Sequence, residues 1–342
     1  MNRKLLTLIQ YFLFFGLGIF LVWWSIHKMS DADWEACKAS LRSARFSLIV
    51  PVFLIITFSH YLRALRWRIL MDPMGYRPGV FNTFSAVMVG YLANLAIPRL
   101  GEVLKCTILA RYEKVPADKL VGTILVERAV DVISLALVFL ITLLTHFSML
   151  GKFAAETLRT HFAGSGWSDL AIKTGMLLLL LAGLFLAGRW VFRRFNHLNS
   201  IKRLQNLVQG VKDGVMSISR LRNKSSFWLY SVSIWTCYLA GTYIGFHATA
   251  GTEWLPVMAS FPVLAFASIG MIITPGGIGA YPWFIKEVMV RYGADQGIAT
   301  ANGLLQWFAQ CLIILIVGFL CLILLPYFNK SGNSHSKQQP AG

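Results

Sequence analysis

The chain has 342 residues, of which 56% are hydrophobic and 14% charged, and its formal net charge is +17. This composition excludes an ordinary soluble domain, because several apolar runs reach the ~20 residues that cross a hydrocarbon core. We therefore predict an all-α integral membrane protein. Residues 1–328 are expected to form a single polytopic membrane domain, and the polar residues 329–342 a disordered C-terminal tail.

The positive charge lies in short loops beside apolar runs, which indicates membrane topology and contact with anionic lipids. We therefore expect no nucleic-acid partner. The five cysteines are isolated from one another and form no cluster with histidine, so we expect no disulfide framework, no metal and no cofactor. The sequence also lacks a GxxxxGK[ST] phosphate-binding loop, so ATP hydrolysis by this chain is not expected.

About six apolar segments are predicted to cross the membrane fully. In chain order they are 5–26, 47–69, 120–146, 170–189, 226–249 and 298–326. Two further apolar segments each end at a proline and glycine break, and a stretch too charged to face lipid follows each break. We predict that these segments form broken re-entrant helical hairpins at about 80–117 and 250–297.

The distribution of lysine and arginine in loops predicts the orientation. Residues 189–224 carry nine such side chains and should be cytoplasmic, whereas residues 147–169 carry two and should be external. Counting spans from there places both termini in the cytoplasm of a bacterial-type inner membrane, with one hairpin entering from each side. This is an inverted-topology repeat, in which broken helices meet near the midplane and form a substrate site. Within the basic loop, 190–224 reads as an amphipathic interfacial segment or, equally, as a linker helix packed on the spans.

Two charged clusters interrupt the first half of the chain. Arg99, Gly101, Glu102 and Lys105 follow the first break. Glycine allows close backbone approach and a helix N-terminus presents free N–H groups, so two cations there suggest a phosphate site; a solvated loop helix explains them equally well. Arg63, in span 47–69, is deep enough in the membrane to line the cavity that would hold this phosphate.

The second cluster is VERAVD, which places Glu127, Arg128 and Asp131 within about one helical turn. A charge in a membrane core costs at least ~2.5–3.5 kcal/mol, so these side chains should face protein or water. The functional interpretation is a polar site that binds a charged headgroup or carries protons. The structural alternative is an internal Glu–Arg pair that locks two helices together.

The second break is TPGGIGAY, with Pro275, Gly276, Gly277 and Gly279. Its glycines are expected to allow close backbone approach at a site shared with the first break.

The segments RALRWR, NLAIPRLGEVLKCTILARYEKVP, LVERAVDVISL and TPGGIGAY, in this order, resemble the lysylphosphatidylglycerol synthase transmembrane-region family. This family comprises the flippase-like half of the multiple peptide resistance factor and many stand-alone homologues. The resemblance covers nearly the whole chain. It implies an inner-membrane protein that moves or handles a polar lipid. Its motif positions in this sequence are Arg99, Gly101, Glu102, Glu127, Arg128, Asp131, Pro275, Gly276, Gly277 and Gly279.

The resemblance has two departures. The soluble lysyl-transferase half of some members is missing from this sequence, so lysyl transfer from tRNA is not expected. Relatives often carry an acidic residue just after the PGG segment, where this sequence has Tyr281 and Pro282.

We therefore predict a flippase or transporter for lipids with a polar or phosphate-bearing headgroup, with anionic or phosphate-bearing membrane lipids as its partners. Two alternatives stay open. One is an intramembrane transferase that acts on a lipid-linked substrate. The other is a non-catalytic membrane subunit of a lipid or glycan synthase, which would have that synthase as a partner. A homo-oligomer is compatible with all three hypotheses.

Overall fold

The computed structural model describes residues 29–97, 99–145 and 221–335, together with scattered positions between 16 and 27. These residues form helices and contain no strand, which confirms the all-α class. Several predicted features lie outside the described residues: most of the span at 5–26, the loop at 147–169, the span at 170–189, nearly all of the segment at 190–224, and the tail beyond residue 335.

The described α-helices follow one another in a simple order along the chain. They are α2 (Asp31–Arg42), α3 (Ile49–Met71), α4 (Val80–Ala96), α5 (Leu100–Glu113), α6 (Ala117–Thr145), α10 (Lys224–Phe246), α11 (Ser260–Ile273), α12 (Ala280–Arg291) and α13 (Gln296–His335). Short 3₁₀ turns flank them: η1 (Phe46–Leu48), η2 (Asp72–Met74), η3 (Val257–Ala259) and η4 (Pro275–Gly277). Helix α13 continues past residue 329, where the tail was predicted to begin.

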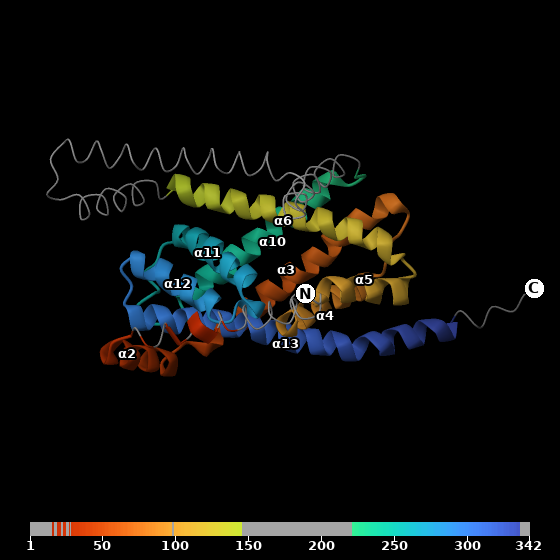
Figure 1. Cartoon of the computed structure of the whole chain (residues 1–342). Coiled ribbons are helices and arrows are strands. Elements are labelled where there is room, and N and C mark those ends of the chain that lie inside the picture. The colour runs from red at the N-terminus through yellow and green to blue at the C-terminus, as the bar shows by residue number, and fades with distance from the viewer. Residues whose placement is uncertain are drawn as a thin grey trace, which may run out of the picture.

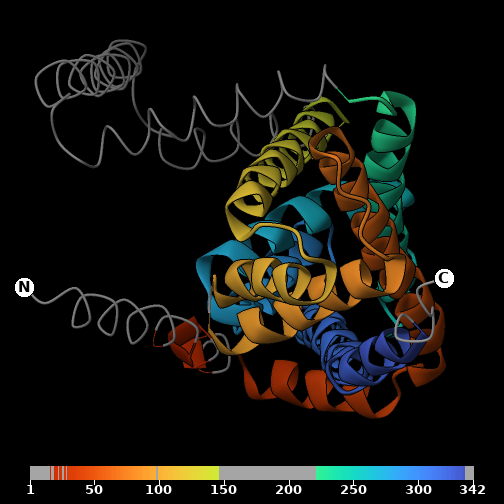
Figure 2. The ribbon, with the colours of Figure 1, turned by 90° about the vertical axis from the view of Figure 1, so that its right-hand side faces the viewer.

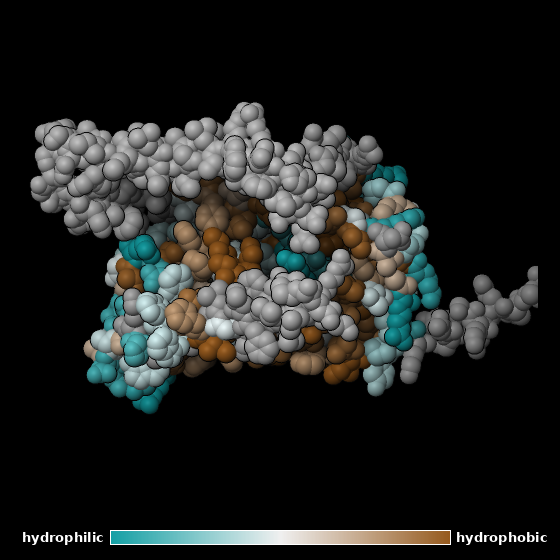
Figure 3. All heavy atoms as spheres, viewed as in Figure 1, coloured by the Kyte–Doolittle hydropathy of each residue, from teal (hydrophilic) through white to brown (hydrophobic). Residues whose placement is uncertain are grey.

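The helices form an elongated bundle with an apolar middle. Figure 1 shows α6 and α13 running along the long direction of the molecule, and Figure 2 shows the helices packed around one another when the view is turned by 90°. In Figure 3 an apolar band lies between two hydrophilic ends. This distribution is the one expected of a protein whose middle contacts lipid tails and whose ends contact water.

Two helical stretches among the described residues are long and apolar enough to cross a membrane by themselves, Phe46–Met74 and Gln296–Asn329. This is fewer than the six predicted full spans. Helix α6 carries charged residues in its middle, and α10 is rich in serine, threonine, tyrosine and tryptophan. Such helices need neighbours that cover their polar side chains.

Two helical pairs lie toward opposite ends of the bundle. Figure 1 shows α4 and α5 toward one end and α11 and α12 toward the other. Each pair packs together closely, and η4 contacts α4. A Cβ atom placed on Gly276 would lie 3.1 Å from Leu95 Cδ2, so the second break touches the helix that precedes the first break. The second break therefore lies against the end of α4 that leads into the first break.

At the first break, a side chain provides a hydrogen bond in place of those that a continuous helix would have made. Arg99 adopts a left-handed backbone conformation with φ of 70°, and α5 begins immediately after it. The Gly101 N–H donates to Asn94 Oδ1 over 2.8 Å, so the side chain of Asn94 caps the N-terminus of α5. A Cβ atom on Gly101 would collide with the Gly90 carbonyl oxygen, so this position requires glycine for helix packing.

The second break depends on three glycines with positive φ. Gly276, Gly277 and Gly279 have φ values of 60°, 72° and 73°, which side chains rarely allow. The Gly276 carbonyl oxygen accepts a hydrogen bond of 2.9 Å from Trp307 Nε1 on α13. A partly buried carbonyl outside the regular helices is thereby satisfied by a side chain.

Helix α2 was absent from the sequence-based prediction. Ser30 and Asp33 form a reciprocal capping box, in which the Asp33 N–H donates to Ser30 Oγ over 3.1 Å. The helix packs against α13, and the Asp33 carbonyl lies so close to Gly297 that a Cβ there would collide with it. A search for apolar spans does not find this helix, because its composition is polar. The capping signal in SDADWE would have predicted its start.

The close approach of α4 and α5 can be tested by adding one methyl group. Gly101→Ala should lower the free energy of unfolding by about 1–3 kcal/mol, because it overpacks the contact with Gly90. Gly122→Ala is the matched control, because that helical glycine has open space around it. Unfolding in detergent micelles, followed by circular dichroism, should separate the two variants; equal stability would contradict the packing role.

Candidate functional site

A fully buried carboxylate lies at the centre of the candidate site. The side chain of Glu127 on α6 has 0% exposed surface. Its Oε1 accepts a hydrogen bond of 2.9 Å from Arg63 Nη1 on α3, and its Oε2 accepts one of 3.0 Å from Lys105 Nζ on α5. One acidic residue therefore joins three helices.

A second carboxylate, one turn further along α6, extends this network. Asp131 Oδ2 accepts from Arg63 Nη1 over 2.5 Å, and Asp131 Oδ1 accepts from Arg66 Nη2 over 2.7 Å. Arg63 Nη2 also donates to the hydroxyl of Tyr238 over 3.2 Å, which connects α10. We call Arg63, Arg66, Lys105, Glu127 and Asp131 the ionic network.

Aromatic and polar neighbours hold the cations of the ionic network in place. Lys105 Nζ lies 4.5 Å from the centre of the Trp67 ring, and Trp67 Nε1 donates to Thr123 Oγ1 over 2.8 Å. The guanidinium carbon of Arg66 lies 6.0 Å from the ring centre of Phe227. Cations placed over aromatic faces in a desolvated site are stabilised electrostatically, so these rings support the charges as well as packing against them.

The ionic network is not electrically balanced. Its three cations face two carboxylates, so it retains an excess of one positive charge. A buried charge must be compensated by a partner of opposite sign. The network is therefore suited to receive an anion.

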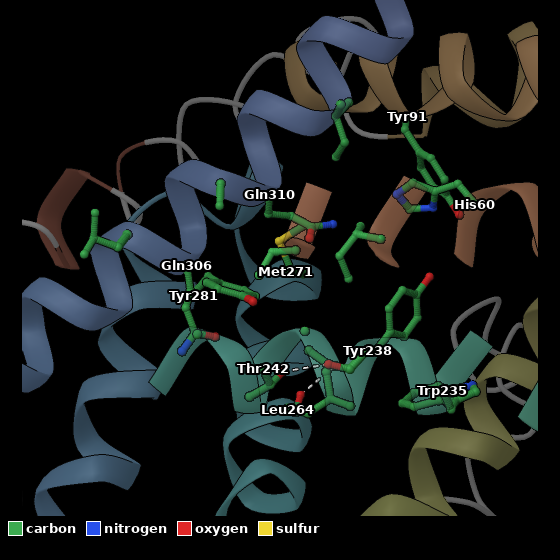
Figure 4. A pocket seen from close by; sticks show the side chains of 18 of the residues that line it. His60, Tyr91, Trp235, Tyr238, Thr242, Leu264, Met271, Tyr281, Gln306 and Gln310 are labelled. Carbon is green, nitrogen blue, oxygen red and sulfur yellow. Dashed lines mark hydrogen bonds between the residues drawn. The ribbon is translucent and has the colours of Figure 1, made fainter. Parts of the chain in front are cut away.

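A cavity of about 440 Å³ lies beside the ionic network, within the ~300–1,000 Å³ range of ligand pockets. Side chains of α3, α6, α10, α11 and α13 form most of its wall. Figure 4 shows His60, Tyr91, Tyr238 and Gln310 around the same space, with Tyr238 pointing into it. The cavity is thus built by helices from both halves of the chain.

The cavity is elongated and changes character along its length. One face of α3 lines the cavity with five side chains at helical spacing, of which the last is a charged arginine: Ile49, Val52, Ile56, His60 and Arg63. Fourteen helical steps between the ends of this series correspond to about 21 Å. The cavity therefore combines an apolar stretch with a polar end, as the binding site of an amphipathic ligand requires.

Several buried polar groups at this cavity lack a hydrogen-bond partner within the described part of the chain. They are both ring nitrogens of His60, Arg63 Nε, Trp235 Nε1 and Arg128 Nε, the last of which is ion-paired with Glu102. His60 is 3% exposed, and its ring lies 4.9 Å from that of Tyr91. Buried polar groups are nearly always paired in folded proteins, so these are exceptions, although the atoms themselves are buried and do not open onto the cavity.

The structure brings together part of the predicted site. Arg63, Lys105, Glu127 and Asp131 join in the ionic network, although they come from three helices. Of these, Arg63 and Asp131 also line the cavity. Arg128, a further predicted residue, lines the cavity as well.

The other predicted residues lie elsewhere. Glu102 pairs with Arg128 at 3.1 Å in a more exposed position, and Arg99 is exposed at the first break. Gly101 lies in the contact between α4 and α5. The turn that contains Pro275, Gly276, Gly277 and Gly279 does not line the cavity; the flanking residues Met271, Ile272 and Tyr281 do.

Sequence reasoning did not include Arg66 or Tyr238 in the site. Arg66 lies three residues after Arg63, so the helical period placed it on the same face of α3. Its position near the end of an apolar span resembled that of a lysine or arginine that reaches lipid phosphates. Tyr238 carried no signal, because nothing in the sequence of α10 distinguishes it from its aromatic neighbours.

Comparison with known proteins agrees with the arrangement of these segments. The family described as "Lysylphosphatidylglycerol synthase TM region" matches residues 9–318, which include every residue of the network and of the cavity lining. The chain belongs to this family. It is therefore a membrane protein, and the match covers the four segments on which the resemblance was based.

The chain is 18% identical over 297 residues to a UPF0104 membrane protein of Methanocaldococcus jannaschii, which covers 81% of this chain and 84% of that protein. No solved structure matches the chain significantly.

The role of Glu127 as the common partner of two cations can be tested by double substitution. Glu127→Gln should lower the free energy of unfolding by about 3–5 kcal/mol, because it leaves Arg63 and Lys105 buried without full compensation. Adding Lys105→Met to that variant should recover part of the loss.

The matched control for this test is Glu35→Gln, which removes an exposed partner of Lys38 and should leave stability nearly unchanged. Unfolding by sodium dodecyl sulfate in mixed micelles provides the measurement. If Glu127→Gln were as stable as the control, the ionic network would not have the structural role assigned to it.

Proposed function

We propose that this protein moves a lipid with a phosphate-bearing headgroup across the inner membrane. The observation that carries the proposal is the cavity whose polar end adjoins an ionic network with an excess positive charge. Arg63 belongs to both. A phosphate beside this guanidinium would balance the excess charge.

The shape of the cavity supports a lipid over a small soluble anion. Its wall between the polar end and η1 consists largely of aliphatic and aromatic side chains. A headgroup can lie at Arg63 while the acyl chains remain in an apolar environment, which avoids the cost of moving a phosphate through hydrocarbon. The positions of the two helical hairpins support a route through the bundle, since the second break lies against the end of α4 that leads into the first break.

We further propose that the chain has the inverted topology expected from its loop charges. The α4–α5 hairpin would enter from the cytoplasmic side and the α11–α12 hairpin from the opposite side. Both termini would be cytoplasmic. Broken helices that meet near the midplane form the substrate sites of many transporters with inverted repeats, and this analogy supports the assignment.

Transport can be measured with purified protein in liposomes that contain a fluorescent phospholipid analogue. The wild-type protein should accelerate movement of the analogue between leaflets. Arg63→Gln and Arg128→Gln should each reduce the rate by about tenfold or more, because each removes a charged donor from the cavity.

Arg68→Gln is the matched control. Arg68 lies on the same helix as Arg63, but its Nε donates to the Pro78 carbonyl over 2.7 Å outside the cavity. The Arg68→Gln variant should move the lipid analogue between leaflets at the wild-type rate. If no phospholipid moves faster than in protein-free liposomes, the proposed function is wrong; a new lipid species in the vesicles would instead indicate an enzyme.

The topology can be tested independently with two single cysteines in a cysteine-free variant. Arg77 follows α3, Glu253 follows α10, and both side chains are exposed. In intact cells, an impermeant thiol reagent should label Glu253→Cys and leave Arg77→Cys unlabelled until the membrane is opened. Labelling of both positions in intact cells would contradict the inverted topology.

A further inference from the structure

We infer, building on the proposed function, that Gln306 on α13 contacts the lipid headgroup in the cavity and accepts a hydrogen bond from one of its O–H or N–H groups. Asn302, one turn earlier on the same helix, is the positioning residue that holds the Gln306 amide in the orientation this requires. The orientation of both amides follows from their partners, beginning at a backbone carbonyl of α10.

Asn302 is fully buried, and a group that can only accept hydrogen bonds determines its orientation. Its side-chain nitrogen lies 2.8 Å from the Gly245 carbonyl oxygen. A carbonyl oxygen has no hydrogen to donate, so the Asn302 atom that faces it must be the NH2 nitrogen. The same nitrogen lies 2.9 Å and 3.1 Å from the hydroxyl oxygens of Thr249 and Thr252. The oxygen of Asn302 is therefore left for the next turn of α13.

The amide of Gln306 is oriented in turn by Asn302. Gln306 Nε2 donates to Asn302 Oδ1 over 2.8 Å, and because Asn302 presents an oxygen there, Gln306 has to present its NH2 group. The packing against α10 agrees with this orientation. A Cβ atom placed on Gly245 would lie 2.6 Å from Gln306 Cδ and 2.8 Å from its Nε2. The nitrogen of the amide thus faces Asn302 and α10, and its oxygen is turned away from them.

The oxygen of Gln306 is both unpaired and accessible. Within the described part of the chain, Oε1 has no hydrogen-bond partner, and it is not one of the unpaired polar atoms that are buried. Gln306 belongs to the cavity wall, and Figure 4 shows its amide there beside Tyr281. An amide oxygen accepts hydrogen bonds and donates none, so its matching partner is an O–H or N–H group.

Gln306 lies some distance along the cavity from Arg63. Tyr238 contacts Arg63 and Gly245 contacts Gln306, and both of these contacting residues are on α10. Seven helical steps separate Tyr238 from Gly245, which corresponds to about 10 Å. Gln310, one turn after Gln306, lines the wall between these levels. A headgroup that moves through the cavity between Arg63 and η1 therefore passes the amides of α13.

An acceptor at this level has a clear physical purpose. The hydroxyl or amino hydrogens of a headgroup lose water when they enter a largely apolar cavity, and burying them unpaired is costly. An uncharged oxygen compensates for part of this loss without holding the headgroup as tightly as a carboxylate would. Because the same oxygen accepts from O–H and from N–H groups, the inference includes headgroups of both kinds.

Two pairs of fluorescent phospholipids in proteoliposomes with the full-length protein test this role at constant headgroup charge. In the anionic pair, the headgroup is glycerol, which has hydroxyl groups, or a methyl ester, which has no donor. In the zwitterionic pair, it is ethanolamine, which has N–H groups, or choline, which has no donor. The donor-bearing lipid should cross about three- to tenfold faster than its partner in at least one pair, the effect of one hydrogen bond.

Substitutions on α13 test which residue provides this preference. Gln306→Met keeps the length of the side chain and removes the amide, so it should reduce the ratio of rates within the responsive pair to about one. Asn302→Ala leaves Gln306 in place but frees its amide to rotate, and it should also lower the ratio. Because each ratio is measured in one preparation, the fraction of correctly folded protein does not affect it.

Gln296→Met is the matched control, since Gln296 begins α13 and does not line the cavity. This variant should keep the wild-type ratio. Equal rates within both pairs for the wild-type protein, or a wild-type ratio for Gln306→Met, would contradict the inference while the protein is still a lipid transporter. If none of the four lipids crosses faster than in protein-free liposomes, the proposed function fails and the inference fails with it.

Discussion

The charge of Glu127 must be compensated inside an apolar bundle, and the arrangement of several helices depends on this requirement. A carboxylate with no exposed surface is tolerated only when cations and hydrogen bonds replace its water. Arg63 on α3 and Lys105 on α5 provide the replacement, while Asp131 brings in Arg66. Because one charge balance is shared by three helices, their rotation and register are determined together. The polar middle of α6 is thus compatible with a membrane only in the folded state.

The two breaks meet a related requirement for backbone groups. Chain that leaves a helix within the bundle exposes N–H and C=O groups where water is scarce. At the first break the side chain of Asn94 accepts the Gly101 N–H, and at the second the indole of Trp307 donates to the Gly276 carbonyl. Glycine then permits the close contacts, with Gly101 against Gly90 and Gly276 against Leu95. Stable irregular backbone in the interior is therefore a product of side-chain partners and of missing Cβ atoms.

Arg63 connects the structural role of the ionic network with the proposed binding role. Its terminal nitrogens hold both carboxylates and the Tyr238 hydroxyl, and the same residue lines the cavity. The ion-pair lock and the binding site, which the sequence presented as alternatives, are compatible because Arg63 belongs to both the ionic network and the cavity wall.

The sequence by itself determined the helical class, the positions of the breaks and the presence of costly charges in α6, because hydropathy, glycine and charge are properties of short segments. It did not determine which charges neutralise one another. One arginine seemed insufficient for Asp131, yet Arg63 and Arg66 both reach it from more than sixty residues away in the sequence. Only the tertiary structure decided these pairings, and only it showed that the turn at 275–279 contacts α4 and α13 without lining the cavity. The physical reason is that such contacts depend on how each helix is rotated against its neighbours, which local patterns do not specify.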